Sequence, residues 1–139
     1  MAYINLYTNN PTAGGTDGTV VSLDGTQTSP ISVTLDKTKA ESKAIKCAIR
    51  CDAGYKTSGD VTISLSGTTA SKWKLAKDSS YADAAAALTG ATWADSIAIS
   101  GVGTTANTIF WVKASSSVDE NPTKDTSVSI KAACTIEAV

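Results

Sequence analysis

Long stretches of the chain alternate apolar and polar residues with the period of two that is typical of a β-strand. The clearest is residues 44–52, where the apolar positions are Ile45, Cys47, Ile49 and Cys51. The same alternation recurs in residues 31–35, 61–65, 97–100 and 128–137. Each of these strands has one apolar face, as the strands of an antiparallel sheet with one covered face do.

Two segments depart from this pattern. Residues 108–114 are apolar on both faces for four residues, which predicts a central strand or one whose outer face is covered. If Phe110 faces the core, Trp111 faces outward, either under a loop or toward a partner. Residues 79–88 have a helical composition, with Ser79 or Ser80 as the expected N-cap. A helix this short is expected to be part of a crossover between sheets.

The spacing of turn residues predicts a two-sheet sandwich. Glycine, serine, asparagine and proline separate the strands, for example at 58–60, 66–68 and 121–122. Strands at this spacing indicate an all-β sandwich of about seven antiparallel strands over residues 30–139. Residues 1–29 are richer in glycine and are predicted to form an extended N-terminal arm or an edge hairpin.

Composition and charge exclude several classes of protein. Twelve basic and thirteen acidic residues leave a net charge of −1, which offers no basic surface for nucleic acid. No apolar run approaches the roughly 20 residues of a membrane span. The first residues carry no secretion signal, so we expect synthesis and folding in the cytoplasm.

The chain contains no histidine, which argues against an enzyme. A Ser-His-Asp triad is impossible without it. The carboxylates of 119–125 are candidates for a calcium loop, but a solvated turn is the favoured reading. The glycines of 14–19 lack the lysine and the helix of a phosphate-binding loop and are interpreted as a flexible turn. We therefore predict neither catalytic residues nor a metal or cofactor.

The three cysteines are predicted to be free, small apolar residues. Cys47 and Cys51 lie four residues apart on one strand, a separation of about 13 Å that is too long for a disulfide. Cys134 makes the count odd. Among the tryptophans, Trp73 is expected in the core and Trp93 at an open end of the sandwich. Exposed tryptophans also stack on sugars, so a carbohydrate-binding module stays open.

Four segments resemble small virion proteins of tailed bacteriophages. The first two are 3–19 (YINLYTNNPTAGGTDGT) and 48–59 (AIRCDAGYKTSG). The other two, 110–116 and 127–131, are similar in style to immunoglobulin-like phage domains. The resemblance implies an immunoglobulin-like β-sandwich preceded by the N-terminal arm, although the disulfide pair of antibody domains is absent.

The resemblance also implies a function. The chain is expected to be a non-enzymatic virion protein, and in particular a capsid decoration protein that stabilises the shell. The alternative is a tail-associated or free carbohydrate-binding module. The expected partner is the major capsid protein or another virion protein, and a homo-oligomer and a cell-surface glycan stay open as partners. The predicted contact residues are Tyr3, Ile4, Leu6, Tyr7, Val20 and Trp111.

Overall fold

Two antiparallel sheets form the computed structural model of the chain, which describes residues 4–21, 35, 41–67, 70–102, 106–116 and 128–138. The larger sheet contains, in spatial order, β2 (Thr19–Val20), β1 (Ile4–Thr8), β3 (Ser42–Cys51), β7 (Thr108–Ser115) and β5 (Trp73–Lys77). The smaller sheet contains β6 (Ser96–Ser100), β4 (Tyr55–Ser66) and β8 (Ser129–Ala138). The predicted antiparallel β-sandwich is thereby confirmed.

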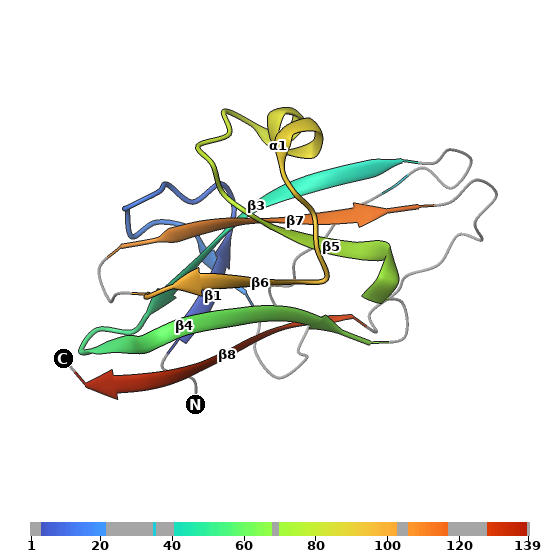
Figure 1. Cartoon of the computed structure of the whole chain (residues 1–139). Coiled ribbons are helices and arrows are strands. Elements are labelled where there is room, and N and C mark those ends of the chain that lie inside the picture. The colour runs from blue at the N-terminus through green and yellow to red at the C-terminus, as the bar shows by residue number, and fades with distance from the viewer. Residues whose placement is uncertain are drawn as a thin grey trace.

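From β3 onward, each successive strand lies in the other sheet (Figure 1). Strands β3, β5 and β7 belong to the larger sheet, and β4, β6 and β8 to the smaller one. No two consecutive strands among these six are hydrogen-bonded neighbours, so their pairing joins residues far apart in sequence. Non-local pairing of this kind is typical of slowly folding β-proteins.

The core between the two sheets contains the apolar faces that the alternation predicts. Buried side chains come from both sheets, and the half-buried apolar residues of β8 pack against them. The buried members are Cys47, Ile49, Cys51, Val61, Ile63, Leu75, Ile97, Ile99, Val102, Phe110 and Val112. The assignment of faces from the sequence is therefore confirmed for β3, β6, β8 and the 61–65 part of β4.

A second apolar cluster lies on the outer face of the larger sheet. The helix α1 (Ala84–Gly90) and the chain on either side of it cover this face (Figure 1). The helix contributes Ala87, and the sheet contributes Ile109 and Trp111 from β7. Strand β7 lies between β3 and β5 and has both faces buried, which accounts for its apolar residues on both parities.

Two local predictions are wrong. Ser58, Gly59 and Asp60 do not end a strand; they lie within β4, where the register with β8 shifts between Ser58 and Thr62. Gly59 has a φ of +81°, which bends the strand as a bulge without ending it. The helix begins later than expected, because Asp83 rather than a serine caps it by accepting a hydrogen bond from the amide of Ala86 at 2.9 Å.

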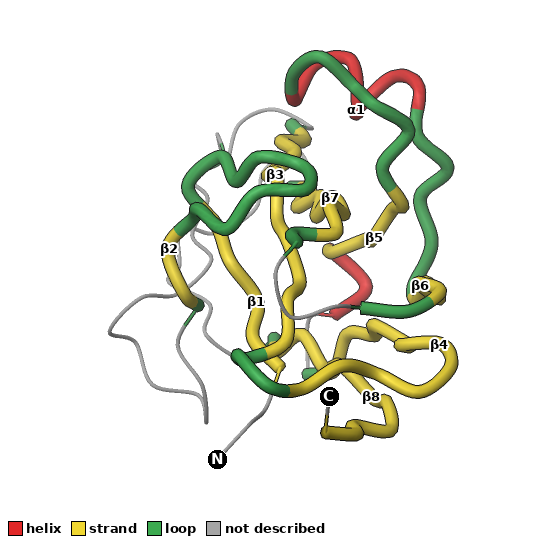
Figure 2. Tube along the Cα trace, turned by 90° about the vertical axis from the view of Figure 1, so that its left-hand side faces the viewer, coloured by secondary structure: helices red, strands yellow, loops and turns green. Residues whose placement is uncertain are grey.

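The N-terminal segment joins the larger sheet. Strand β1 pairs with β3 over four residues and with β2 on its other side (Figure 2). Asn9 and Asn10 follow β1 with left-handed backbone angles, a conformation that asparagine tolerates better than most residues. Four residues of the predicted strand at 31–35 and the carboxylates of 119–125 lie outside the described residues. None of the described helices is long and apolar enough to cross a bilayer.

Candidate functional site

The predicted contact residues occupy different environments. Tyr3 lies outside the described residues, Ile4 and Leu6 are half-buried against the core between the sheets, and Val20 is 47% exposed. Tyr7 and Trp111 are 9% and 2% exposed and belong to the outer apolar cluster. Their side chains are enclosed by the chain itself, because the outer face of the larger sheet is covered, so neither offers a free surface to a partner.

Trp111 is held by polar contacts as well as by packing. Its indole Nε1 donates a hydrogen bond to Asp78 Oδ1 at 2.9 Å, and the amide of Tyr81 donates to the same oxygen at 3.4 Å. The Tyr81 ring meets the indole edge-on, with 6.4 Å between centroids. Trp111 thus fixes the segment between β5 and α1 onto the sheet.

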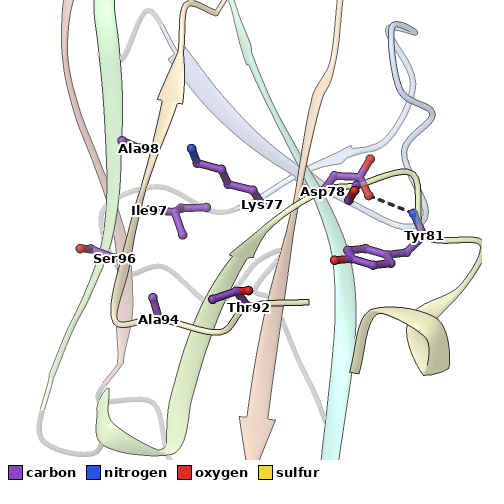
Figure 3. Close-up of a pocket in the computed structure, with 9 residues that line it drawn as sticks. Lys77, Asp78, Tyr81, Thr92, Ala94, Ser96, Ile97 and Ala98 are labelled. Carbon is purple, nitrogen blue, oxygen red and sulfur yellow. Dashed lines mark hydrogen bonds between the residues drawn. The ribbon is translucent and has the colours of Figure 1, made fainter. Parts of the chain in front are cut away.

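A crevice opens beside this segment, between the end of β5 and β6 (Figure 3). Its volume is about 440 Å³. Lys77 extends from the end of β5 toward Ile97 and Ala98 of β6. The lining residues are Lys77, Asp78, Ser79, Tyr81, Thr92, Ala94, Ser96, Ile97 and Ala98.

The lining of the crevice is rich in groups that form hydrogen bonds. Ser79, Tyr81, Thr92 and Ser96 bring hydroxyl groups that donate and accept hydrogen bonds. Lys77 adds a cation, and Asp78 is already engaged by Trp111 and Tyr81. Asp78 is the one carboxylate among the residues that line the crevice. The described residues contain no group of three His, Cys, Asp or Glu side chains placed to hold a metal ion.

Asn107 organises the loop between β1 and β2. The side chain is 4% exposed, and its Nδ2 lies 3.1 Å from Thr12 O, Asp17 O and Asp17 Oδ1. Its backbone exchanges hydrogen bonds with Gly14 and Gly15 at 3.0 and 2.8 Å. The glycine-rich loop, interpreted from sequence as a flexible turn, is therefore held against the sandwich by hydrogen bonds to the side chain and backbone of Asn107.

Arg50 and Asp17 complete this arrangement, which we call the Asn107 network: Thr12, Asp17, Arg50 and Asn107. Arg50 donates from Nη1 to Asn107 Oδ1 at 2.5 Å, and its guanidinium lies 4.0 Å from the centroid of the Tyr7 ring. The carboxylate of Asp17 accepts from the amide and the hydroxyl of Thr12, both at 2.8 Å. These hydrogen bonds, first that of the amide, hold the pKa of Asp17 below its ordinary value of 3.8.

The lowered pKa of Asp17 predicts a loss of stability in acid. A carboxyl group whose folded pKa is depressed stabilises the fold above its unfolded pKa and loses this contribution as pH falls through the folded pKa. We expect the contribution to be complete above pH 3.8 and to disappear progressively below it. Urea unfolding of the wild type and of Asp17→Asn should differ above this pH and converge below it. A constant difference at every pH would contradict the assignment.

The cysteines are separate thiols, as expected. Burial raises the pKa of Cys47 to about 12 and also raises the pKa values of Cys51 and Cys134. Since the thiolate is the reactive form, Cys47 should react with a maleimide only as fast as the chain unfolds. Mass spectrometry of the labelled chain in water and in urea checks this. Rapid labelling of Cys47 in water would contradict its burial.

Sequence reasoning missed the residues that hold these surfaces in place. Asp78 follows β5 and Asn107 precedes β7. Nothing in the neighbouring sequence distinguishes either of them from an ordinary loop residue. Asp17 was part of a segment interpreted as a turn. Asn107 lies 95 residues from its partner Thr12, and Asp78 lies 33 residues from its partner Trp111. Only the fold brings the members of each pair together.

No family model matches the chain, and neither the curated proteins nor the solved structures contain a match.

Proposed function

We propose that this chain is a non-enzymatic structural protein of a phage virion, an immunoglobulin-like decoration protein that binds the capsid shell. The resemblance of the four segments named above supports the proposal. The sheet order supports it too: an immunoglobulin domain has strands A-B-E-D in one sheet and C beside F in the other. With β1, β3, β7 and β5 as A, B, E and D, β4 and β8 become the neighbours C and F, whereas β6, which pairs with β4 and comes between β5 and β7 in the chain, has no counterpart in that pattern.

The observation that carries the proposal is the preformed surface at the β1–β2 end. The Asn107 network fixes the loop that leads into β2, and β2 has β1 as its described neighbour. Val20 is the exposed large hydrophobic residue of the described chain and lies on this two-residue strand. A fixed loop loses little entropy on binding, and an open strand edge with an apolar side chain accepts a strand of a partner.

Binding to phage heads tests the proposal. Purified full-length chain is mixed with heads of the phage that encodes it, stripped of decoration proteins, and the bound fraction is measured by co-sedimentation. We expect saturable binding that Val20→Glu weakens by at least about tenfold, because a charge replaces an apolar contact.

The matched control is Thr62→Glu, which places the same charge on an exposed position of β4 in the other sheet. It should leave binding unchanged. Absence of binding by the wild-type chain would overturn the capsid proposal. Equal binding of wild type and Val20→Glu would remove the β1–β2 end as the contact surface.

A carbohydrate-binding module is the second candidate, and the hydroxyl-lined crevice favours it. Its test is a glycan array probed with the wild type, Lys77→Ala and Thr92→Ala, with Thr62→Ala on β4 as the control. Loss of a signal in the two crevice variants alone would support it. An array without any wild-type signal would remove it. Trp93 and Trp111 are unsuitable probes, because the first is half-buried and the second fully buried.

A further inference from the structure

Strand β8 is a long sheet edge that the described chain leaves open. It spans ten residues at the border of the smaller sheet, and β4 is its hydrogen-bonded neighbour there (Figure 1). The other edges are smaller: β2 has two residues, β6 has five, and β5 has five with a bridge from Leu75 to Ala94. A long edge without proline is a template for pairing with another strand.

The apolar face of β8 is also less covered than that of its neighbour. Val61 and Ile63 of β4 are fully buried. The inward-facing residues of β8 are only half-buried: Ile130, Ala132, Cys134 and Ile136. Among the described residues, β4 has a neighbouring strand on each side, whereas β8 has one on a single side. A further strand beside β8 would lower the exposure of these half-buried side chains.

The charges of β8 fit a second copy of the same strand. A two-fold axis perpendicular to the sheet keeps both apolar faces on one side, and then opposite residues must have the same parity. When the axis passes through Cys134, a residue that precedes Cys134 by a given number of positions lies opposite the residue of the second copy that follows Cys134 by the same number. Lys131 and Glu137 are each three residues from Cys134, so each lysine lies opposite a glutamate of the second copy.

Neighbouring residues reinforce this register. Glu137 is paired within the chain to Lys56 of β4, with 3.3 Å between Nζ and Oε1. In the paired edges it would lie between two lysines, one from each copy. Moving the axis by one residue to Ala133 would place Lys131 opposite Thr135 and lose both charge pairs. Opposite charges facing each other across strands are favourable, and like charges are not.

We propose that two copies of the chain associate through their β8 edges, antiparallel about a two-fold axis at Cys134, to form a continuous sheet of six strands. The order of this sheet is β6-β4-β8 in one copy followed by β8-β4-β6 in the other. The association is isologous, since the same residues contribute from both copies. The association does not depend on capsid binding, because the proposed capsid contact is at the β1–β2 end of the other sheet.

Charge reversal of the full-length chain tests the proposal by sedimentation equilibrium. The wild type should form dimers. Lys131→Glu places glutamates opposite one another, and Glu137→Lys places lysines opposite one another, so each variant should dimerise at least about tenfold more weakly. A mixture of the two variants restores both opposite-charge pairs and should form heterodimers. This recovery separates edge pairing from a folding defect of either variant.

Thr62→Glu, on the exposed face of the central strand β4, is the control and should dimerise like the wild type. Hydrogen exchange adds the location: β8 amides should become more protected as the chain concentration rises, and β6 amides should not. A wild type that stays monomeric up to about 1 mM would overturn the proposal. So would dimers that both reversal variants form as readily as the wild type.

Discussion

Trp111→Ala is expected to lower the free energy of unfolding by about 3–5 kcal/mol, the usual cost of removing a fully buried large aromatic side chain. The substitution empties the middle of the outer apolar cluster and removes the hydrogen bond to Asp78. The segment that carries α1 would then lose the contacts of Asp78 and Tyr81 with β7. Chemical unfolding followed by far-ultraviolet circular dichroism measures the change.

Trp111→Phe separates packing from hydrogen bonding at the same position. The phenyl ring keeps much of the apolar contact but has no group to donate to Asp78, so the loss should be smaller, about 1–3 kcal/mol. Asp78→Asn retains an oxygen acceptor for the indole and should cost less than either. If Trp111→Ala cost under about 1 kcal/mol, the outer cluster would not be a stabilising layer.

Asn107→Ala is expected to cost about 2 kcal/mol and to release the loop between β1 and β2. The amide side chain donates toward three oxygens of Thr12 and Asp17 and accepts from Arg50. Its removal takes a hydrogen-bonding partner from Thr12 and Asp17, which are exposed, and from Arg50, which is half-buried. Unfolding in urea measures the stability, and limited proteolysis within residues 12–18 measures the release of the loop.

Asn5→Ala is the matched control for this substitution. Asn5 donates one hydrogen bond, from Nδ2 to Asp52 Oδ1 at 2.7 Å, in the neighbouring strand pair. It should cost about 1 kcal/mol or less and leave the loop resistant to protease. If Asn107→Ala behaved like Asn5→Ala in both measurements, the loop would be held by its backbone contacts alone. Capsid binding should weaken in Asn107→Ala if the fixed loop contributes to that surface.

The assignment of residues to faces was predictable because it depends on a local property. Side chains alternate across a strand, so the apolar positions of β3 and β8 identify their inward faces without knowledge of their neighbours. The apolar residues on both parities of β7 likewise predicted a covered outer face. The covering element also follows from the sequence in part, since the helix was expected in a crossover between sheets.

The bulge in β4 and the cap of α1 were not predictable in the same way. A Ser-Gly-Asp sequence is typical of a turn, and Gly59 adopts the left-handed backbone angle that a turn would use. Pairing with β8 and β6 on both sides keeps the strand together across this point. Serine and aspartate are both suitable N-caps, so residue type alone does not distinguish Ser79 and Ser80 from Asp83, which caps the helix in the structure.

The sequence by itself determined the class of fold, the faces of the strands and the absence of histidine chemistry, because these depend on residue type and on a period of two. Only the tertiary structure decided which strands are neighbours, that Tyr7 and Trp111 are enclosed, and that Asn107 holds the glycine-rich loop. It also left β8 at an open edge with Lys131 and Glu137 equally far from Cys134. These features depend on contacts between residues far apart in the chain, and alternation carries no information about such contacts.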